Sequence, residues 1–290
     1  MTIKAYKWYG GKLRMAHTIS LLMPEHTAYY EPFMGSGAVL LNHPRSSLEV
    51  LNDLDKDLAC LMKTLADRQK GEILTERLGK LWYGREFFNE AAEHRKRHYR
   101  GLDDIEKSAM VFTLITQSFN GTRKDFSAKA YRDTNAYRAD IKFHIPKVHE
   151  RLKGVHVLNM DGIDLMAEIA DNPNAFVFAD PPYRKELRGA GSGKIYACEL
   201  PHSQQVRMLK TIQRAKCKTM LCGYRAENGD DLYDAYLIPY GWKCYKLADV
   251  SKSCQASKEH RDIGHEYIWV NYQLPETAGF VISLKEYGAA

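Results

Sequence analysis

The chain has 290 residues, of which 44% are hydrophobic and 27% are charged, and its formal net charge is +6. These values are typical of a folded globular protein with one large domain or with a core domain that carries an insertion. No apolar run of about 18 residues is present, so we exclude a membrane-spanning helix and expect no membrane partner. The first residues are polar and aromatic, and they give no indication of a signal peptide.

The six cysteines are scattered along the chain and never form a CxxC pair. Structural zinc sites usually contain such pairs, so we predict no metal. Reduced thiols without a disulfide pattern favour a cytoplasmic protein.

Basic residues are concentrated between positions 184 and 218, where nine Lys and Arg residues are opposed only by Glu186 and Glu199. A polyanionic partner would explain this excess, because phosphate contacts supply most non-specific nucleic-acid affinity. An ordinary solvated basic surface would explain it equally well. The charge alone does not decide between the two.

In chain order, the first 66 residues read as strand, glycine turn, helix, strand and acidic residue. The turn contains Gly35 and Gly37, and the acidic residue is Asp53. This order is typical of a nucleotide-binding α/β unit. The elements expected here are a strand at 27–30, a helix at 38–41, a strand at 48–51 and a helix at 57–66.

Residues 67–150 differ in character from the segments on either side. Apolar residues recur at three- and four-residue spacing over 82–99 and 104–119, which predicts helices, whereas 121–140 is polar and basic. After this segment the α/β pattern returns. The later elements expected are strands at 155–158, 175–179, 219–222, 242–247 and 266–272, helices at 163–170 and 203–215, and a glycine-rich loop at 189–193.

We therefore predict an α/β fold in which a core domain is interrupted by an insert. The core consists of residues 1–66 and 151–274, and the insert is 67–150. Residues 275–290 are expected to be a loose tail.

The tetrapeptide Asp180-Pro181-Pro182-Tyr183 follows the apolar strand at 175–179. Open α/β sheets bind ligands at the carboxyl ends of their strands. The two prolines fix the backbone and remove two N–H donors, so nearby carbonyl groups become directed acceptors. A carboxylate and a rigid carbonyl are suited to holding an amine, and the tyrosine ring can stack on a base. The alternative is a proline turn that merely ends the strand.

The segment Glu31 to Gly37 reads EPFMGSG. Glycine lets the backbone approach a ligand closely and tolerates positive φ, although many GxG sequences are simple turns. Asp53 ends the next strand, where an acid suits a pair of ribose hydroxyl groups. Its alternative role is the N-cap of the helix that begins near Asp55.

Near the N-terminus, Lys7 to Lys12 reads KWYGGK. Paired glycines between lysines and an aromatic residue can close over a zwitterionic ligand, with a lysine meeting its carboxylate. The alternative is a flexible, solvated terminus.

Taken together, the chain resembles the Dam-like adenine-specific DNA methyltransferases, whose sequences run KWxGGK, PFxGSG, a target-recognition insert and DPPY. All four elements occur in that order over positions 7–183, and residues 266–272 are similar to the closing strand of that family. The resemblance implies a Rossmann-like S-adenosylmethionine-dependent methyltransferase sheet. It implies that 67–150 reads the target in double-stranded DNA.

The resemblance also implies roles for individual residues. Asp180 to Tyr183 would form the catalytic tetrapeptide, and Gly162 departs from the aromatic residue usual after the family's acid. The positions that would contact S-adenosylmethionine are Trp8, Lys12, Phe33, Gly35, Gly37, Asp53, Asp161 and Asp180.

A further set of residues matches family positions near the DNA. Phe119 would wedge into the duplex at the start of a hairpin, unless it is a core residue that closes the preceding helix. Members that read GATC usually continue with Leu after the aromatic-Asn-Gly element, whereas this chain continues with Thr122, so GATC is not predicted. The residues expected to bind DNA are Lys7, Phe119, Asn120, Gly121, Arg123 and Lys124.

The expected reaction is direct methyl transfer to the exocyclic amine of a flipped adenine. Cytosine-amine and RNA adenine methyltransferases and a non-catalytic DNA-binding module remain alternatives. Cytosine-carbon methylation is excluded because it typically uses a Pro-Cys pair, which this sequence lacks. We expect a monomer in the cytoplasm of a bacterial or phage-infected cell, acting at the nucleoid in restriction-modification or a related DNA modification.

Overall fold

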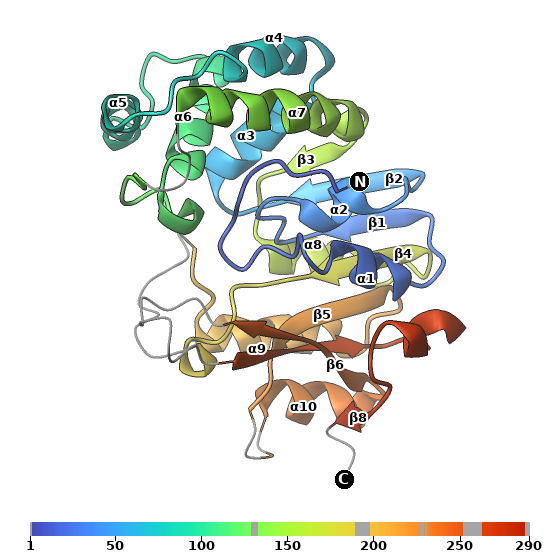
Figure 1. Ribbon diagram of the computed structural model, residues 1–290. Helices are drawn as coiled ribbons and strands as arrows, with labels where there is room; N and C mark the ends of the chain where they lie inside the picture. Colours follow the sequence, from blue (N-terminus) through green and yellow to red (C-terminus); the bar gives the residue numbers. More distant parts are fainter. Residues whose placement is uncertain are drawn as a thin grey trace. The chain divides into compact units, whose positions relative to one another are not determined.

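The structure is a computed structural model (Figure 1). It describes residues 2–128, 133–188, 198–226, 229, 231–251 and 263–287. The glycine-rich loop expected at 189–193 lies outside these residues.

The described strands form one eight-stranded sheet with the order β3-β2-β1-β4-β5-β7-β6-β8. The pairs β2–β3, β1–β4 and β4–β5 are parallel, and β5–β7, β6–β7 and β6–β8 are antiparallel. The predicted α/β class with a Rossmann-like sheet is therefore confirmed. The strands are β1 (Ala28–Glu31), β2 (Leu48–Asn52), β3 (His156–Leu158), β4 (Ala175–Ala179), β5 (Lys218–Tyr224), β6 (Lys243–Ser251), β7 (Ile263–Val270) and β8 (Glu286–Tyr287).

Most helices lie close to the predicted positions, although several were not expected. The α-helices are α1 (Ala16–Leu21), α2 (Ala38–Asn42), α3 (Lys56–Ala66), α4 (Arg68–Leu78), α5 (Arg85–Lys96), α6 (Asp104–Thr116), α7 (Thr134–Leu152), α8 (Gly162–Ile169), α9 (His202–Ile212) and α10 (Leu232–Leu237). Short 3-10 turns are η1 (Phe119–Gly121), η2 (Lys185–Leu187), η3 (Ile238–Tyr240) and η4 (Glu276–Phe280). None of the described helices has the length and apolar character that a membrane crossing requires.

The chain divides into two compact units, which are described separately below. Unit 1 is Met1–Ala16, Met34–Pro44 and Val50–Asn159, and unit 2 is His17–Phe33, Arg45–Glu49 and Met160–Ala290. The N-terminal segment and the glycine turn belong to unit 1, together with the helical residues 67–150.

Within unit 1, α3, α4, α6 and α7 pack on one another, and α5 packs on α6 (Figure 1). The 19-residue helix α7 was not predicted, because residues 121–140 were read as a polar and basic segment. Its buried apolar residues nevertheless recur every three or four positions, as a helix with one apolar face requires. These residues are Tyr137, Ile141, Ile145, Val148 and Leu152.

Within unit 2, β1, β4 and β5 are parallel, and every residue of β1 and β4 is buried. A buried parallel strand reads as a continuous apolar run, which is why β4 was predicted correctly. The expected loose tail is not observed over 276–287. There, η4 buries Ala278, and β8 pairs with β6 at the edge of the sheet.

Candidate active site

In unit 1, the glycine turn packs against the N-terminal segment. Gly35 and Gly37 have φ of +49° and +61°, which favours glycine at both positions. A Cβ atom on Gly35 would lie 2.8 Å from Nε1 of Trp8, so the indole ring also requires the absence of a side chain. The hydroxyl of Tyr6 donates to the Gly35 carbonyl over 2.9 Å, and its ring meets Trp8 edge-on.

The side chain of Asp53 holds the same glycine turn in place. Its carboxylate accepts hydrogen bonds from the backbone N–H of Gly35 at 3.0 Å and of Asp55 at 2.9 Å. The N-cap of α3 is Asp55, which accepts from Asp57 N and Leu58 N, so the alternative N-cap role for Asp53 is wrong. Burial raises the pKa of Asp53 to about 6, although the two amide hydrogen bonds oppose this rise.

Lys12 is buried, with only 3% of its surface exposed. Its ammonium group donates to the Gly10 carbonyl over 3.0 Å. Gly11 lies close to Trp8 and Ser36, where an added Cβ atom would be 3.1 Å from the Trp8 carbonyl oxygen. Within this segment, Lys12 is therefore not solvated, whereas Lys7, Gly10 and Gly11 are exposed.

The hairpin at residues 117–127 is a short turn closed by a bridge between Ser118 and Phe126. Phe119 at its start is 52% exposed, which excludes the alternative of a core residue. Asn120 and Gly121 both have positive φ, and the Asn120 side chain accepts from the Lys7 ammonium group over 3.1 Å. Gly121 packs on the Lys7 carbonyl so closely that a Cβ atom would lie 2.5 Å from its oxygen. Lys124 is exposed.

Arg123 does not lie where a DNA-contacting residue is expected. Only 5% of its surface is exposed. Its guanidinium is paired with the carboxylate of Asp55 and lies 3.8 Å from that of Asp57. It also lies over the Trp8 ring, 5.8 Å from the ring centre. Arg123 therefore joins the hairpin to the Asp53–Asp57 loop.

In unit 2, the tetrapeptide leaves the sheet beside the end of β1. Strands β1 and β4 are parallel neighbours, with Tyr30 opposite Val177. The residues after β1, which include Phe33, and those after β4, which include Asp180, therefore leave at the same edge. Asp180 is partly exposed and Pro181 is buried.

Tyr183 is buried, and its ring meets Tyr224 edge-on with 4.7 Å between the ring centres. The carbonyl of Pro182 accepts a hydrogen bond from the side-chain amide of Gln205 over 3.0 Å. No described residue donates to the carbonyl of Pro181. The Pro182 carbonyl is thus held in place by the Gln205 side chain.

Asp161 is the N-cap of α8, and it accepts from Ile163 N at 2.7 Å and from Arg207 at 3.1 Å. The next residue, Gly162, packs against Phe33, so an added Cβ atom would lie 2.8 Å from the phenyl ring. The Phe33 ring thus occupies the space that a side chain at 162 would need. This packing gives a physical reason for the glycine at this position.

Two of the basic residues at 184–218 are used inside the protein, whereas five others are exposed: Lys185, Arg207, Lys210, Arg214 and Lys216. Arg184 and Arg188 are buried and paired with Asp231 and Glu199. Arg207 pairs with Asp161 and Asp164, and Lys216 pairs with Asp171. Neither a solvated surface nor a polyanion site is needed to explain Arg184 and Arg188. Lys194 lies outside the described residues.

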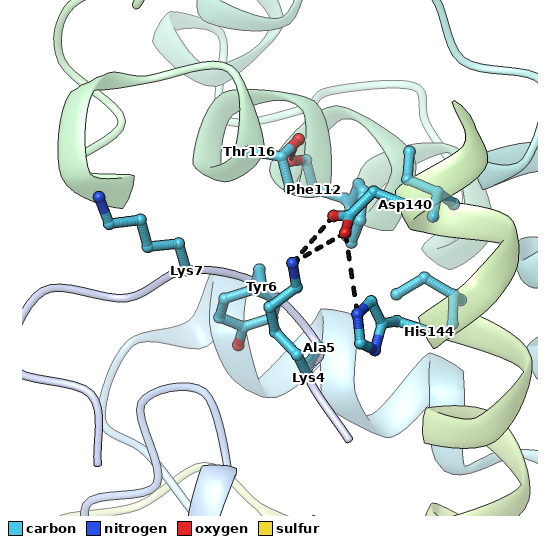
Figure 2. A pocket seen from close by; sticks show the side chains of 10 residues that line it. Lys4, Ala5, Tyr6, Lys7, Phe112, Thr116, Asp140 and His144 are labelled. Carbon is cyan, nitrogen blue, oxygen red and sulfur yellow. Dashed lines mark hydrogen bonds and ion pairs between the residues drawn. The ribbon is translucent and has the colours of Figure 1, made fainter. Parts of the chain in front are cut away.

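A cavity of about 190 Å³ in unit 1 does not coincide with the predicted cofactor residues (Figure 2). Lys4 and Asp140 form an ion pair across it at 3.0 Å, and His144 lies 3.7 Å from the same carboxylate. Lys7 also lines this cavity, but in Figure 2 its side chain extends away from the ion pair.

Sequence reasoning did not anticipate Tyr6, Asp55 and Gln205, which contact the predicted residues, or Tyr233, which contacts Gln205. Asp55 carried a local signal, because an acid two residues before a helical pattern is a common N-cap. Gln205 and Tyr233 carried none, since their partners lie far away in the chain.

Comparison with known proteins identifies the family of this chain. A family model for the D12 class N6 adenine-specific DNA methyltransferases matches residues 8–247. The type II methyltransferase M.MjaIII of Methanocaldococcus jannaschii is 25% identical in an alignment of 268 residues that covers 82% of this chain and 90% of the relative.

Two further relatives match at similar identity. The type II methyltransferase M1.LlaDCHI of Lactococcus lactis subsp. cremoris is 27% identical in an alignment of 198 residues that covers 61% of this chain and 64% of that protein. The DNA N-6-adenine-methyltransferase of Escherichia phage P1 is 25% identical over 79% of this chain, which spans 30% of the phage protein. The family inferred from the ordered sequence elements is confirmed: the chain belongs to the D12 class of N6 adenine-specific DNA methyltransferases.

Proposed function

We propose that this chain transfers a methyl group from S-adenosylmethionine to the exocyclic amine of adenine in duplex DNA, with Asp180 to Tyr183 holding the amine. The observation that carries the proposal is the tetrapeptide itself. It follows the fully buried strand β4, and one of its two proline carbonyls is fixed by Gln205 while the other has no described donor.

The amine must be held while its lone pair is directed at the methyl group. The Asp180 carboxylate and the Pro181 carbonyl are acceptors for the two N–H groups of the amine. These two hydrogen bonds draw the nitrogen lone pair out of conjugation with the ring. In direct attack the amine nitrogen forms the new N–C bond as the sulfonium S–C bond breaks, the electron pair of that bond stays on sulfur, and one amine proton is released to solvent. Because no covalent enzyme intermediate is needed, positioning supplies most of the acceleration. Tyr183 contributes an aromatic face for the base, on a ring that Tyr224 supports.

The residues present fit the cofactor chemically. S-adenosylmethionine supplies an electrophilic methyl group on a sulfonium, together with an amino-acid carboxylate and a ribose. The buried Lys12 ammonium group suits a carboxylate, and the glycine turn beside Trp8 admits a close backbone approach. Each oxygen of Asp53 accepts one backbone N–H and keeps a second lone pair for a ribose hydroxyl.

Phe33 and Asp161 complete the proposed cofactor set in unit 2. Asp161 uses its carboxylate to cap α8 and to pair with Arg207, and Phe33 is fixed against Gly162. These contacts hold both side chains in place before a ligand binds. The entropic cost of ordering them on binding is therefore smaller.

For the DNA, we infer that residues 67–150 form the target-recognition insert. Phe119 is an exposed ring on a hairpin, which suits insertion into a base step as the target base is flipped out. Lys7 and Lys124 are exposed cations beside it and suit phosphate contacts. Arg123 is reassigned from DNA contact to holding the hairpin in position. Restriction-modification or related DNA modification in the cytoplasm, by a monomer, is the proposed setting.

The test is transfer of radiolabel from S-adenosylmethionine to duplex DNA, single-stranded RNA or protein, followed by identification of the labelled base. Wild-type protein is expected to label adenine in duplex DNA alone. Asp180→Ala is expected to abolish labelling while DNA binding is kept. Asp171→Ala, at an exposed ion pair, is the matched control and should retain the wild-type rate. Full activity of Asp180→Ala, or label in RNA or protein only, would refute the proposal.

A further inference from the structure

In unit 2, buried polar side chains form a closed ring of contacts with the tetrapeptide. Gln205 on α9 is 1% exposed. Its Nε2 donates to the Pro182 carbonyl at 3.0 Å and, more weakly, to the Leu200 carbonyl at 3.4 Å. Its Oε1 accepts from the hydroxyl of Tyr233 on α10 at 2.6 Å. The amide therefore connects the tetrapeptide backbone to α10.

The chemistry of the partners fixes which way this amide points. A proline carbonyl can only accept, so the Gln205 NH₂ group faces Pro182 and the oxygen faces Tyr233. Burial raises the pKa of Tyr233 well above its ordinary value, so its hydroxyl stays protonated and donates. A primary amide supplies a donor and an acceptor at one end of the side chain, and an ionised carboxylate would supply acceptors alone.

A second connection runs from the other end of the tetrapeptide to the same helix. Arg184 follows Tyr183 directly, and its guanidinium pairs with Asp231 and donates to the Tyr224 carbonyl at 3.1 Å. Asp231 is the N-cap of α10 and accepts from Tyr233 N at 2.8 Å. The Arg184 guanidinium also lies over the Tyr233 ring, 4.8 Å from its centre.

The two connections close a ring of contacts that contains Tyr183. The path runs from Pro182 through Gln205 and Tyr233 to Asp231, and then through Arg184 back to the tetrapeptide. The side chains of Gln205, Tyr233, Asp231 and Arg184 are all buried. Removing one partner of a buried hydrogen bond leaves the other partner unsatisfied, which costs the full desolvation energy of that group. The ring therefore restrains the tetrapeptide backbone on both sides of Tyr183.

We propose that Gln205 and Tyr233 are positioning residues for methyl transfer, which hold the Pro182 carbonyl and thereby the acceptors at Asp180 and Pro181. The inference rests on the proposed function of the tetrapeptide. Neither residue needs to touch the substrate. A displacement of about 1 Å in a reacting group costs on the order of 100-fold in rate, so loss of this restraint reduces catalysis without removing a binding contact.

The first test is Tyr233→Phe, which removes one oxygen and keeps the ring beneath Arg184. The single-turnover methylation rate is expected to fall about tenfold or more, with the dissociation constants for duplex DNA and S-adenosylmethionine changed less than about twofold. Tyr272→Phe is the matched control, because it also removes a hydroxyl bond in unit 2, a 3.0 Å bond to the Leu22 carbonyl. The control is expected to keep the wild-type rate.

The second test uses Gln205→Glu and the pH dependence of its rate. The ionised glutamate cannot donate to the Pro182 carbonyl, whereas the protonated form can donate to it and still accept from Tyr233. Relative to wild type, the rate of this variant is expected to recover as the pH is lowered from about 8.5 to about 6, because burial favours the neutral acid. A purely structural role would make the rate follow the folded fraction, which is measured in parallel by circular dichroism.

The outcomes separate the two proposals. If Tyr233→Phe and Gln205→Glu methylate at the wild-type rate while Asp180→Ala is inactive, the positioning role is refuted and the tetrapeptide assignment stands. If Asp180→Ala is fully active, the proposed function fails. Should Gln205→Glu not fold, Tyr233→Phe alone decides, with a wild-type rate again refuting the positioning role.

Discussion

The guanidinium of Arg123 is paired with the carboxylate of Asp55 in the interior of unit 1, across 68 residues of sequence. Asp55 in turn donates its backbone N–H to Asp53, the proposed ribose-binding acid. This pair connects the hairpin at 117–127, proposed to meet the DNA, to the loop proposed to hold the cofactor.

Removing Arg123 should therefore affect stability more than DNA affinity. Arg123→Ala leaves the largely covered Asp55 carboxylate without its cation, and breaking a buried pair typically costs about 3 to 5 kcal/mol. The free energy of unfolding, measured by urea denaturation, is expected to fall by about this amount. Lys124→Ala, which changes the exposed neighbour, is expected to leave it within about 0.5 kcal/mol. An unchanged unfolding energy in Arg123→Ala would contradict this role.

Cofactor binding is expected to weaken as the pH is lowered through about 6. In this range Asp53 gains a proton, since burial raises its pKa to about 6. A protonated carboxyl group is a poorer acceptor for the Gly35 N–H group and for a ribose hydroxyl group. Protonation of Asp53 has the opposite effect on the stability of the fold, which it increases. The folded value exceeds the ordinary 3.8, so this group stabilises the fold below pH 4, and the contribution is lost as the pH rises through about 6.

This dependence is measured as the dissociation constant of S-adenosylmethionine by calorimetry between pH 5 and pH 8. Asp53→Asn is the control, because its side chain does not titrate. Its affinity should be lower than that of wild type and should not change over this range. A wild-type profile that is equally flat would exclude titration of Asp53 as a determinant of binding.

Gly162 is expected to tolerate no side chain while Phe33 is in place. Gly162→Ala brings a methyl group to 2.8 Å from the Phe33 ring and from the Pro32 carbonyl, and overpacking of this kind costs about 1 to 3 kcal/mol. The melting temperature should fall, and Phe33→Leu in the same chain should restore part of the loss. Gly79→Ala, where the nearest atoms lie 3.5 Å from the added methyl group, is the control and is expected to be neutral or slightly stabilising.

Phe119→Ala is expected to weaken productive DNA binding without destabilising the protein. The ring is 52% exposed, and contacts between an aromatic side chain and a base are worth about 1 to 3 kcal/mol, or about 5- to 150-fold in affinity. Fluorescence anisotropy with labelled duplex measures the change, and 2-aminopurine fluorescence at the target base reports flipping. Phe143→Ala is the control at a matched 50% exposure. Equal losses in both variants would argue against a specific contact by Phe119.

Much of the fold could be predicted because its signals are local. The apolar run of β4 and the turn with Gly35 and Gly37 depend on neighbours within a few residues, and both were placed correctly. Helix α7 was missed although its apolar residues follow helical spacing, since the polar and basic character of residues 121–140 was given more weight than the spacing. The end of the chain was read as loose because η4 and β8 are too short to leave a strong local pattern.

The site was predicted less completely. The sequence indicated that an acid near position 53 would matter, but Asp53 and Asp55 carry the same chemistry, and only their hydrogen bonds to Gly35 and to the α3 amides separate their roles. Similarly, an arginine beside an exposed aromatic residue suits DNA contact by composition. The structure instead buries Arg123 against Asp55.

By itself, the sequence determined the α/β class, the order of the four elements and the family. Strand burial, turn glycines and motif spacing each depend on residues that lie close together in the chain. Only the tertiary structure decided which carboxylate holds the glycine turn, that Arg123 is an internal cation, and that Gln205 fixes the Pro182 carbonyl. These relationships join residues about 20 to 70 positions apart. Such pairings are set by how helices and strands pack, and no local periodicity records them.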